Sequence, residues 1–208
     1  MIRLQPRNKT QLFVEADDHI IGVVSRSSVK PYISGEGEQV LNNRLLPELK
    51  QMIESFTWDR LLNYLARREH TEAECRQYLT RYRTSGEIAE KLLQKALKMR
   101  YVSDERAAEM FISAMVRQAK PEVVIRGKLH EKGISEPIIE SAIARFLTRE
   151  TVNELCLNAV RKAVRRFRQL PESEKFDKIM TALYRQGFDY YDVKDLVLEK
   201  LKEVNEEV

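Results

Sequence analysis

The stretch LARREHTEAECRQYL, residues 65–79, gathers side chains that often carry chemistry: one histidine, three carboxylates and one of the two cysteines of the chain. A cysteine with a nearby histidine could act as a nucleophile with its base, and His70 with Glu74 could begin a metal site. A metal would need further ligands, and the sequence offers no cluster nearby. The phosphate-loop, dinucleotide-binding, nucleophile-elbow and zinc-protease motifs are all missing from the sequence. We therefore expect no catalytic residues, no metal, no cofactor and no enzymatic activity.

The composition favours a mainly α-helical, globular protein. Hydrophobic residues make up 43% and charged residues 33% of 208 residues, with only 7 glycines and 6 prolines for turns. No apolar run approaches the ~20 residues of a membrane helix, and the N-terminus lacks a signal-peptide core, so we expect a cytoplasmic protein without membrane contact. Cys75 and Cys156 lie too far apart to suggest a disulfide framework or zinc. The net charge of +4 permits an acidic or nucleic-acid partner.

The first 40 or so residues differ from the rest. TQLFVEA and HIIGVVS resemble strands, and they flank Asp17 and Asp18, which suit a hairpin turn. The polar segment SGEGEQ, residues 34–39, reads as a connector. From Pro47 onward the pattern is helical, with Pro47 expected as the first residue of a helix.

The helical part contains an internal repeat. LHEKGI at residues 129–134 matches LYRQGF at residues 183–188, and a fainter copy begins at Leu79. At these offsets Cys75 is equivalent to Ile125 and Ile179, so we expect its thiol to be a small core group rather than a reactive one.

The two glycines of the matching segments, Gly133 and Gly187, suit the left-handed residue that ends a helix. Arg83 stands at that position in the first copy, so its turn is expected to differ.

Each copy is expected to form three helices. Apolar residues recur at i, i+3, i+4 and i+7, Thr71 with Glu74 forms a capping-box pattern, and Asp189 can cap the last helix. We expect four parts: a strand-rich extension at 1–46, a linker helix with the first repeat at 47–101, the second repeat at 102–148, and the third at 149–208.

The segment AVRKAVRRFRQ, residues 159–169, places its apolar residues on one helix face and its cations on the other. We predict that this positive surface binds an acidic partner or phosphates, although a solvated helix face explains the pattern equally well. Its cations are Arg161, Lys162, Arg165, Arg166 and Arg168. Further candidates, for which solvent exposure is the simpler explanation, are Arg67, Arg68, Arg117, Lys120 and Arg126.

Four segments together resemble the RecX regulatory proteins: LLNYLARREHTEAECRQYL, YVSDERAAEMFISAMVRQ, VIRGKLHEKGISEPIIESAI and LYRQGFDYYDVKDLV. The resemblance runs from about Trp58 to Leu201. It implies three tandem three-helix repeats in an elongated, curved array with a short β-rich N-terminal extension. Departures from the family pattern are Arg83 and the segment MVRQAKPEVV, which lacks a glycine before the second helix of its repeat.

The same resemblance implies a modulator of the RecA recombinase, in the first instance an inhibitor. Such proteins bind the groove of the RecA–DNA filament and limit filament extension, ATP hydrolysis and strand exchange, and so regulate DNA repair, recombination and the SOS response. We expect a monomer, with direct contact to single- or double-stranded DNA left open. The alternative is a helical-repeat DNA-binding protein that acts through phosphates without RecA. The sign of the effect, the RecA surface contacted and the role of the extension stay open at this point.

Overall fold

The computed structural model describes residues 1–35 and 37–206, with side chains through residue 204. The chain divides into two compact units, Met1–Asp104 and Glu105–Val208. These units do not follow the four expected parts one by one. The first unit joins the strand-rich extension to the first repeat, and the second joins the second repeat to the third. The finer boundaries therefore stay a prediction.

The extension is an antiparallel sheet of strand order β3-β2-β1-β4. Its strands are β1 (Ile2–Asn8), β2 (Gln11–Ala16), β3 (His19–Ser25) and β4 (Gln39–Leu41). The predicted hairpin is confirmed as β2–β3, and Asp17 and Asp18 form its turn with φ of 50° and 61°, the left-handed values of a two-residue hairpin loop. The sequence gave no indication of β1 and β4.

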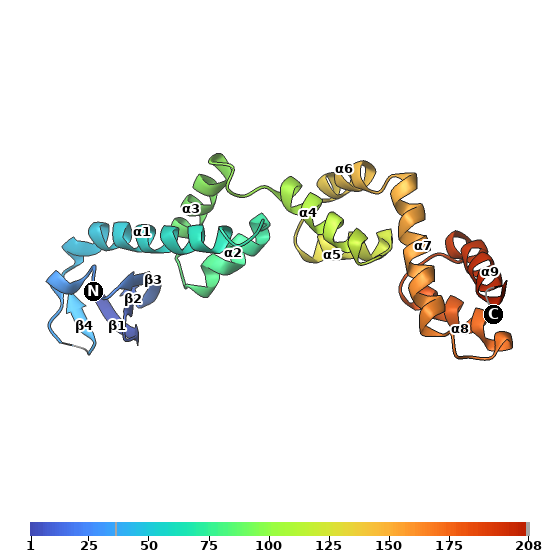
Figure 1. The fold of residues 1–208 in the computed structure, drawn as a ribbon. Helices are drawn as coiled ribbons and strands as arrows, with labels where there is room; N and C mark the ends of the chain where they lie inside the picture. Colours follow the sequence, from blue (N-terminus) through green and yellow to red (C-terminus); the bar gives the residue numbers. More distant parts are fainter. Residues whose placement is uncertain (36, 207–208) are drawn as a thin grey trace. The chain divides into compact units, whose positions relative to one another are not determined.

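Helix α1 (Leu46–Leu65) covers this sheet (Figure 1). Ile53 of α1 lies so close to β3 that a Cβ on Gly22 would stand 2.4 Å from its Cγ2 atom. Only glycine allows the helix to approach the strand this closely. The shared core also includes Ile88 and Leu92 of α3, so the sheet is packed onto the first repeat.

The first repeat uses the second half of α1 with α2 (Glu72–Arg81) and α3 (Gly86–Lys98). The second unit contains α4 (Asp104–Arg117, which begins one residue before the unit boundary), α5 (Glu122–Glu131), α6 (Glu136–Phe146), α7 (Arg149–Arg166), α8 (Glu172–Arg185) and α9 (Tyr190–Glu206). The fold is thus mainly helical, as predicted. Cys75, Ile125 and Ile179 are each 0% exposed in the cores of the three repeats, which confirms their equivalence.

The prediction that the turn at Arg83 differs is wrong. Arg83 has φ of 50°, in the same left-handed region as Gly133 at 75° and Gly187 at 94°. The N–H of Arg83 donates to the Thr80 carbonyl and the N–H of Thr84 to the Leu79 carbonyl, which is also the pattern around the two glycines. The turn geometry is therefore required by the fold, and arginine adopts it at a cost in strain.

Ala119 accounts for the missing glycine in MVRQAKPEVV. It is left-handed too, with φ of 55°, at the end of α4. Its side chain is only 5% exposed and packs into the core formed by α7, α8 and α9, together with Val116. The methyl group therefore joins the second repeat to the third, a contact that glycine could not make.

We predict that Arg83→Gly stabilises the protein. Glycine adopts positive φ without the steric cost that arginine carries there, so the free energy of unfolding should rise by about 0.5–1 kcal/mol. Urea unfolding followed by circular dichroism measures this change. Gly133→Ala is the matched control at the equivalent turn, and we expect it to lower stability by about 1 kcal/mol. Equal destabilisation by both variants would contradict the shared-turn interpretation.

Candidate partner-binding surface

The His70–Cys75 stretch is structural. Cys75 is fully buried, and burial, reinforced by the charge of Glu74, raises the pKa of its thiol to about 12. Thr71 and Glu74 form the predicted capping box at the start of α2. The Glu74 carboxylate also accepts two bonds from Arg68, at 3.0 and 3.1 Å. The carboxylate is therefore committed to helix capping and an ion pair.

His70 is also part of the packing. Its ring lies 3.7 Å from that of Tyr64 and its Nε2 donates to the Tyr64 carbonyl at 3.1 Å. Burial lowers the pKa of this imidazole, although Glu74 lies 3.3 Å from its Nδ1. Within the described part of the chain, no three His, Cys, Asp or Glu side chains are grouped to hold a metal ion.

Helix α7 positions the predicted positive surface. Thr148 caps its N-terminus, where the hydroxyl accepts from the N–H of Thr151 at 3.3 Å. One face of the helix packs against α8 and α9 in the third core (Figure 1). The buried residues of that face are Leu155, Cys156, Ala159, Val160, Ala163 and Val164. This packing fixes which side of α7 remains in solvent.

The five cations of residues 159–169 all lie on the solvent side and are exposed. Arg161 and Arg165 form one i, i+4 pair along the helix, and Lys162 and Arg166 form a second, beside Arg168 in the turn that follows. Within residues 1–35 and 37–204, no carboxylate forms an ion pair with any of the five. Arg166 instead lies 5.2 Å from the ring of Phe167. We call these five residues the α7 cation row.

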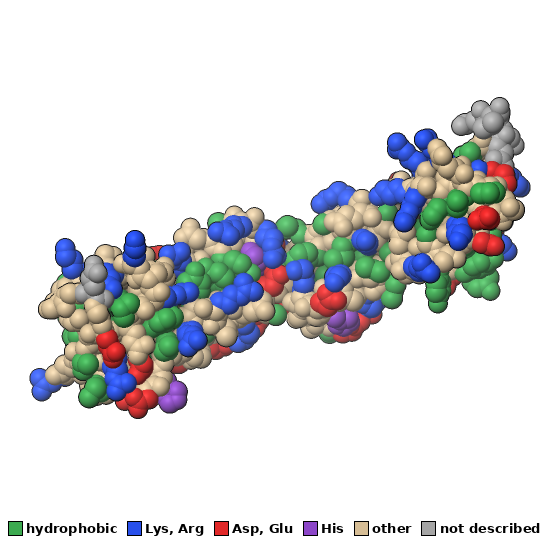
Figure 2. Space-filling model, turned by 90° about the horizontal axis from the view of Figure 1, so that it is seen from below, with side chains coloured by type: hydrophobic (Ala, Val, Ile, Leu, Met, Phe, Trp, Pro, Cys, Tyr) green, Lys and Arg blue, Asp and Glu red, His purple; other side chains and the backbone are tan. Residues whose placement is uncertain are grey.

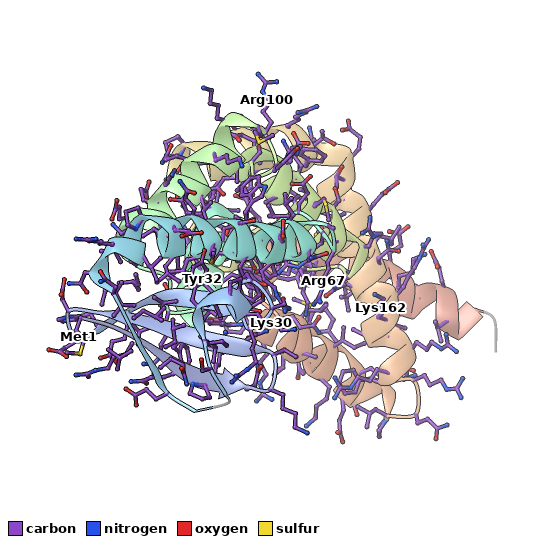
Figure 3. The ribbon with its side chains drawn as sticks, turned by 90° about the vertical axis from the view of Figure 1, so that its left-hand side faces the viewer. Met1, Lys30, Tyr32, Arg67, Arg100 and Lys162 are labelled. Atoms are coloured by element: carbon purple, nitrogen blue, oxygen red, sulfur yellow. The ribbon has the colours of Figure 1, made fainter. Side chains whose placement is uncertain are left out.

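The row keeps its charge available because α7 carries no acidic residue after Glu154. On the face seen in Figure 2, Lys and Arg side chains are spread over much of the surface, among smaller groups of Asp and Glu. Lys162 on α7 and Arg67 beyond the end of α1 are marked in Figure 3. Unpaired surface cations of this kind can attract an anionic partner at long range, more strongly at low salt.

The other candidates separate into paired and unpaired cations. Arg126 contacts three carboxylates, those of Glu122, Glu136 and Glu140, at 3.0, 2.6 and 2.7 Å, and these contacts raise its pKa. Arg68 is held by Glu74, as described above. The remaining three are exposed and have no ion pair within the described residues: Arg67, Arg117 and Lys120. A binding role for any of these candidates stays a prediction.

The sequence reasoning missed two cations next to the α7 row. A hollow of about 570 Å³ lies between α7 and α8, and Arg166, Lys178 and Arg185 line it with one acid, Asp177. Lys178 and Arg185 are seven residues apart on α8 and so share a helix face. That spacing was present in the sequence, but only the packing of α8 on α7 brings the pair to Arg166.

No helix in the described residues is long and apolar enough to cross a bilayer.

Two family models match the chain in order. RecX, first three-helix domain, matches residues 58–95, and RecX, second three-helix domain, matches residues 103–143. These ranges fall on α1–α3 and α4–α6. The match is therefore to the first two helical repeats, and it leaves the sheet and the third repeat outside the matched ranges.

Curated proteins and solved structures extend the similarity. The regulatory protein RecX of Streptococcus sanguinis is 25% identical over 190 residues, which cover 90% of this chain and 72% of that protein. The regulatory protein RecX of Limosilactobacillus reuteri is 31% identical over 145 residues, 68% of this chain and 54% of that protein. A crystal structure of regulatory protein RecX, 24% identical, aligns over 94% of this chain and all of that one with a TM-score of 0.63, so the fold is shared.

We predict that Cys75 is unreactive in the folded protein. Because its thiol is buried and its pKa is raised to about 12, a maleimide reagent at pH 7.5 should label it only on the timescale of unfolding. Cys75→Val should cost less than about 1.5 kcal/mol, since valine fills a similar volume. Mass spectrometry of labelled peptides distinguishes Cys75 from Cys156, whose 4% exposed side chain lines a hollow and serves as the internal reference. Labelling of Cys75 before Cys156 would contradict the assignment.

Proposed function

Because this chain belongs to the RecX family of regulatory proteins, we propose that it regulates the RecA recombinase by binding the groove of the RecA–DNA filament. In this proposal it limits filament extension, ATP hydrolysis and strand exchange, and acts mainly as an inhibitor. The regulatory name of its relatives, rather than a reaction, describes the family.

The observation that carries the proposal is the α7 cation row. Its five side chains are exposed, adjacent and free of ion pairs within the described residues. A surface of this kind favours association with a partner of opposite charge, because complementary charges raise the association rate and fix the orientation of the complex. A filament of protein and DNA offers phosphates and acidic side chains in the same groove.

The repeat architecture supports a filament as the partner. Tandem helical repeats present their exposed helix faces in series, which suits an extended partner better than a small ligand. Each repeat has its own buried core, so the exposed faces are held rigidly. A protein bound along a groove in this way would bridge neighbouring filament subunits and hinder the movements that extension and strand exchange require.

The second candidate is a DNA-binding protein that acts through phosphates without RecA. The same row of five cations favours it, because each neutralised phosphate releases counterions. If all five contacted phosphates of duplex DNA, the logarithm of the binding constant would fall with the logarithm of salt concentration with a slope of about −4 to −5.

Co-sedimentation with RecA filaments on single-stranded DNA distinguishes the candidates. The DNA must be fully covered by RecA, DNA alone is the control, and RecA-catalysed ATP hydrolysis is measured in the same samples. The proposal expects the chain to sediment with filaments and to lower ATP hydrolysis. Sedimentation with DNA alone to the same extent, with hydrolysis unchanged, would favour the second candidate.

We predict that reversing the row weakens filament binding. The triple variant Arg161→Glu, Arg165→Glu, Arg168→Glu should lose roughly 1 kcal/mol for each reversed charge, about 100-fold in affinity. Its helix content should match the parent, because the three side chains are exposed. The concentration that halves RecA-catalysed ATP hydrolysis is the measurement.

The matched control carries the same change elsewhere: Lys9→Glu, Arg44→Glu, Lys98→Glu. These three residues are also exposed and form no ion pair within the described residues. Both triple variants move the formal net charge from +4 to 4 − 6 = −2. A loss in the row variant alone locates the contact, whereas an equal loss in both would reduce the effect to overall charge.

A further inference from the structure

The third repeat carries a group of tyrosines that the helical core does not use. Tyr184, near the end of α8, is 76% exposed, and Tyr190 and Tyr191, at the start of α9, are 43% and 84% exposed. The rings of Tyr190 and Tyr191 meet edge to face, with centroids 5.5 Å apart. Tyrosine rings in water at three neighbouring positions form a surface suited to binding planar groups.

Two of these tyrosines border a small apolar hollow. It has a volume of about 230 Å³, and Tyr184 and Tyr190 stand in its wall opposite apolar side chains. Its other lining residues are Met180, Thr181, Phe188 and Val193. Thr181 is the only one of these six with a short polar side chain, so the hollow offers rings and aliphatic groups, and almost no hydrogen-bonding specificity.

A cationic hollow adjoins the aromatic one across α8. Thr181 lines both. On the far side lie Arg166, Lys178 and Arg185, none of which forms an ion pair within the described residues. Lys178, Thr181 and Arg185 follow one another at i, i+3 and i+7, and Tyr184 stands beside Arg185 in the same turn. The surface of α8 therefore presents unpaired cations on one side and exposed rings on the other, about one helical turn apart.

The cationic hollow is continuous with the α7 cation row, because Arg166 belongs to both. The result is a line of positive charge that ends at an aromatic patch. A ligand that matches both parts must carry repeated negative charges and planar apolar rings at a fixed spacing. Single-stranded nucleic acid has this chemistry, with phosphates along its backbone and bases whose faces are free to stack.

We propose that the third repeat binds single-stranded DNA directly, with bases stacked on Tyr184 and Tyr190 and phosphates held by Lys178, Arg185 and Arg166. Duplex DNA fits less well, since its bases are already stacked and would leave the tyrosines in water. This site does not depend on RecA, so it is a contact beyond the proposed filament-groove binding and is tested without RecA.

The test is the binding of a dye-labelled oligothymidylate of about 15 nucleotides to the full-length chain, followed by fluorescence anisotropy. Tyr184→Ala should weaken binding by about fivefold to 100-fold, as expected for one base–ring stack. Tyr184→Phe is the matched control, because it keeps the ring and removes the hydroxyl, and should bind like the parent. Tyr184 is 76% exposed, so neither variant should disturb the fold.

The cationic side is tested with Lys178→Gln, Arg185→Gln. This double variant should weaken binding and make the slope of log affinity against log salt less steep by about 1.4, or about 0.7 for each lost phosphate contact. Binding of the oligothymidylate that responds to both the ring and the cations supports the site.

Three results would overturn it: no binding of the oligothymidylate, equal binding of a duplex of the same length, or indifference to Tyr184→Ala. If Tyr184→Ala instead reduces only the inhibition of RecA, the tyrosines are a protein-docking surface. The parent chain's effect on RecA-catalysed ATP hydrolysis is scored separately, so failure of this site and failure of the proposed function give different results.

Discussion

The interaction on which the helical part of the chain depends is a pair of backbone hydrogen bonds at the end of a helix. At five helix ends a residue with positive φ lets the next N–H donate to the carbonyl five residues earlier: Arg83, Arg100, Ala119, Gly133 and Gly187. These bonds satisfy carbonyls that would otherwise lack partners, and they reverse the chain so that the next helix packs back on the previous one. Only two of the five residues are glycine, so the geometry is retained even where the side chain opposes it.

Once the turns are set, burial decides which faces remain in solvent. Cys75, Ile125 and Ile179 occupy equivalent places in the three cores, and each anchors the second helix of its repeat. Two further contacts tie the repeats to their neighbours. The extension packs on α1 and α3 through the core that includes Ile53, and Ala119 inserts into the third core. The exposed charges are thereby carried on rigid helices, which preserves their spacing for a partner.

The charges on those faces have two different roles. Arg126 neutralises three carboxylates of its own repeat and Arg68 holds the carboxylate that caps α2, so these cations stabilise helices locally. The α7 row has no such partners within the described residues, and neither do Lys178 and Arg185 beside it. An ion pair at the surface contributes little to stability, but an unpaired row retains a field that acts over about 8–10 Å at physiological salt. The distinction between structural and available cations is therefore a property of pairing rather than of residue type.

The sequence by itself determined the features that depend on local pattern. Periodicity gave the helices and the repeat, the Asp17–Asp18 pair gave the β2–β3 hairpin, and the repeat alone assigned Cys75 to a core. Tertiary structure decided the rest, because those features depend on contacts between distant segments. The left-handed turn at Arg83 follows from how α2 and α3 must pack, not from a residue preference. Strand β4 exists only through its pairing with β1. The neutralisation of Arg126 and the meeting of Arg166 with Lys178 and Arg185 arise where separate helices bring side chains together, and no local spacing carries that information.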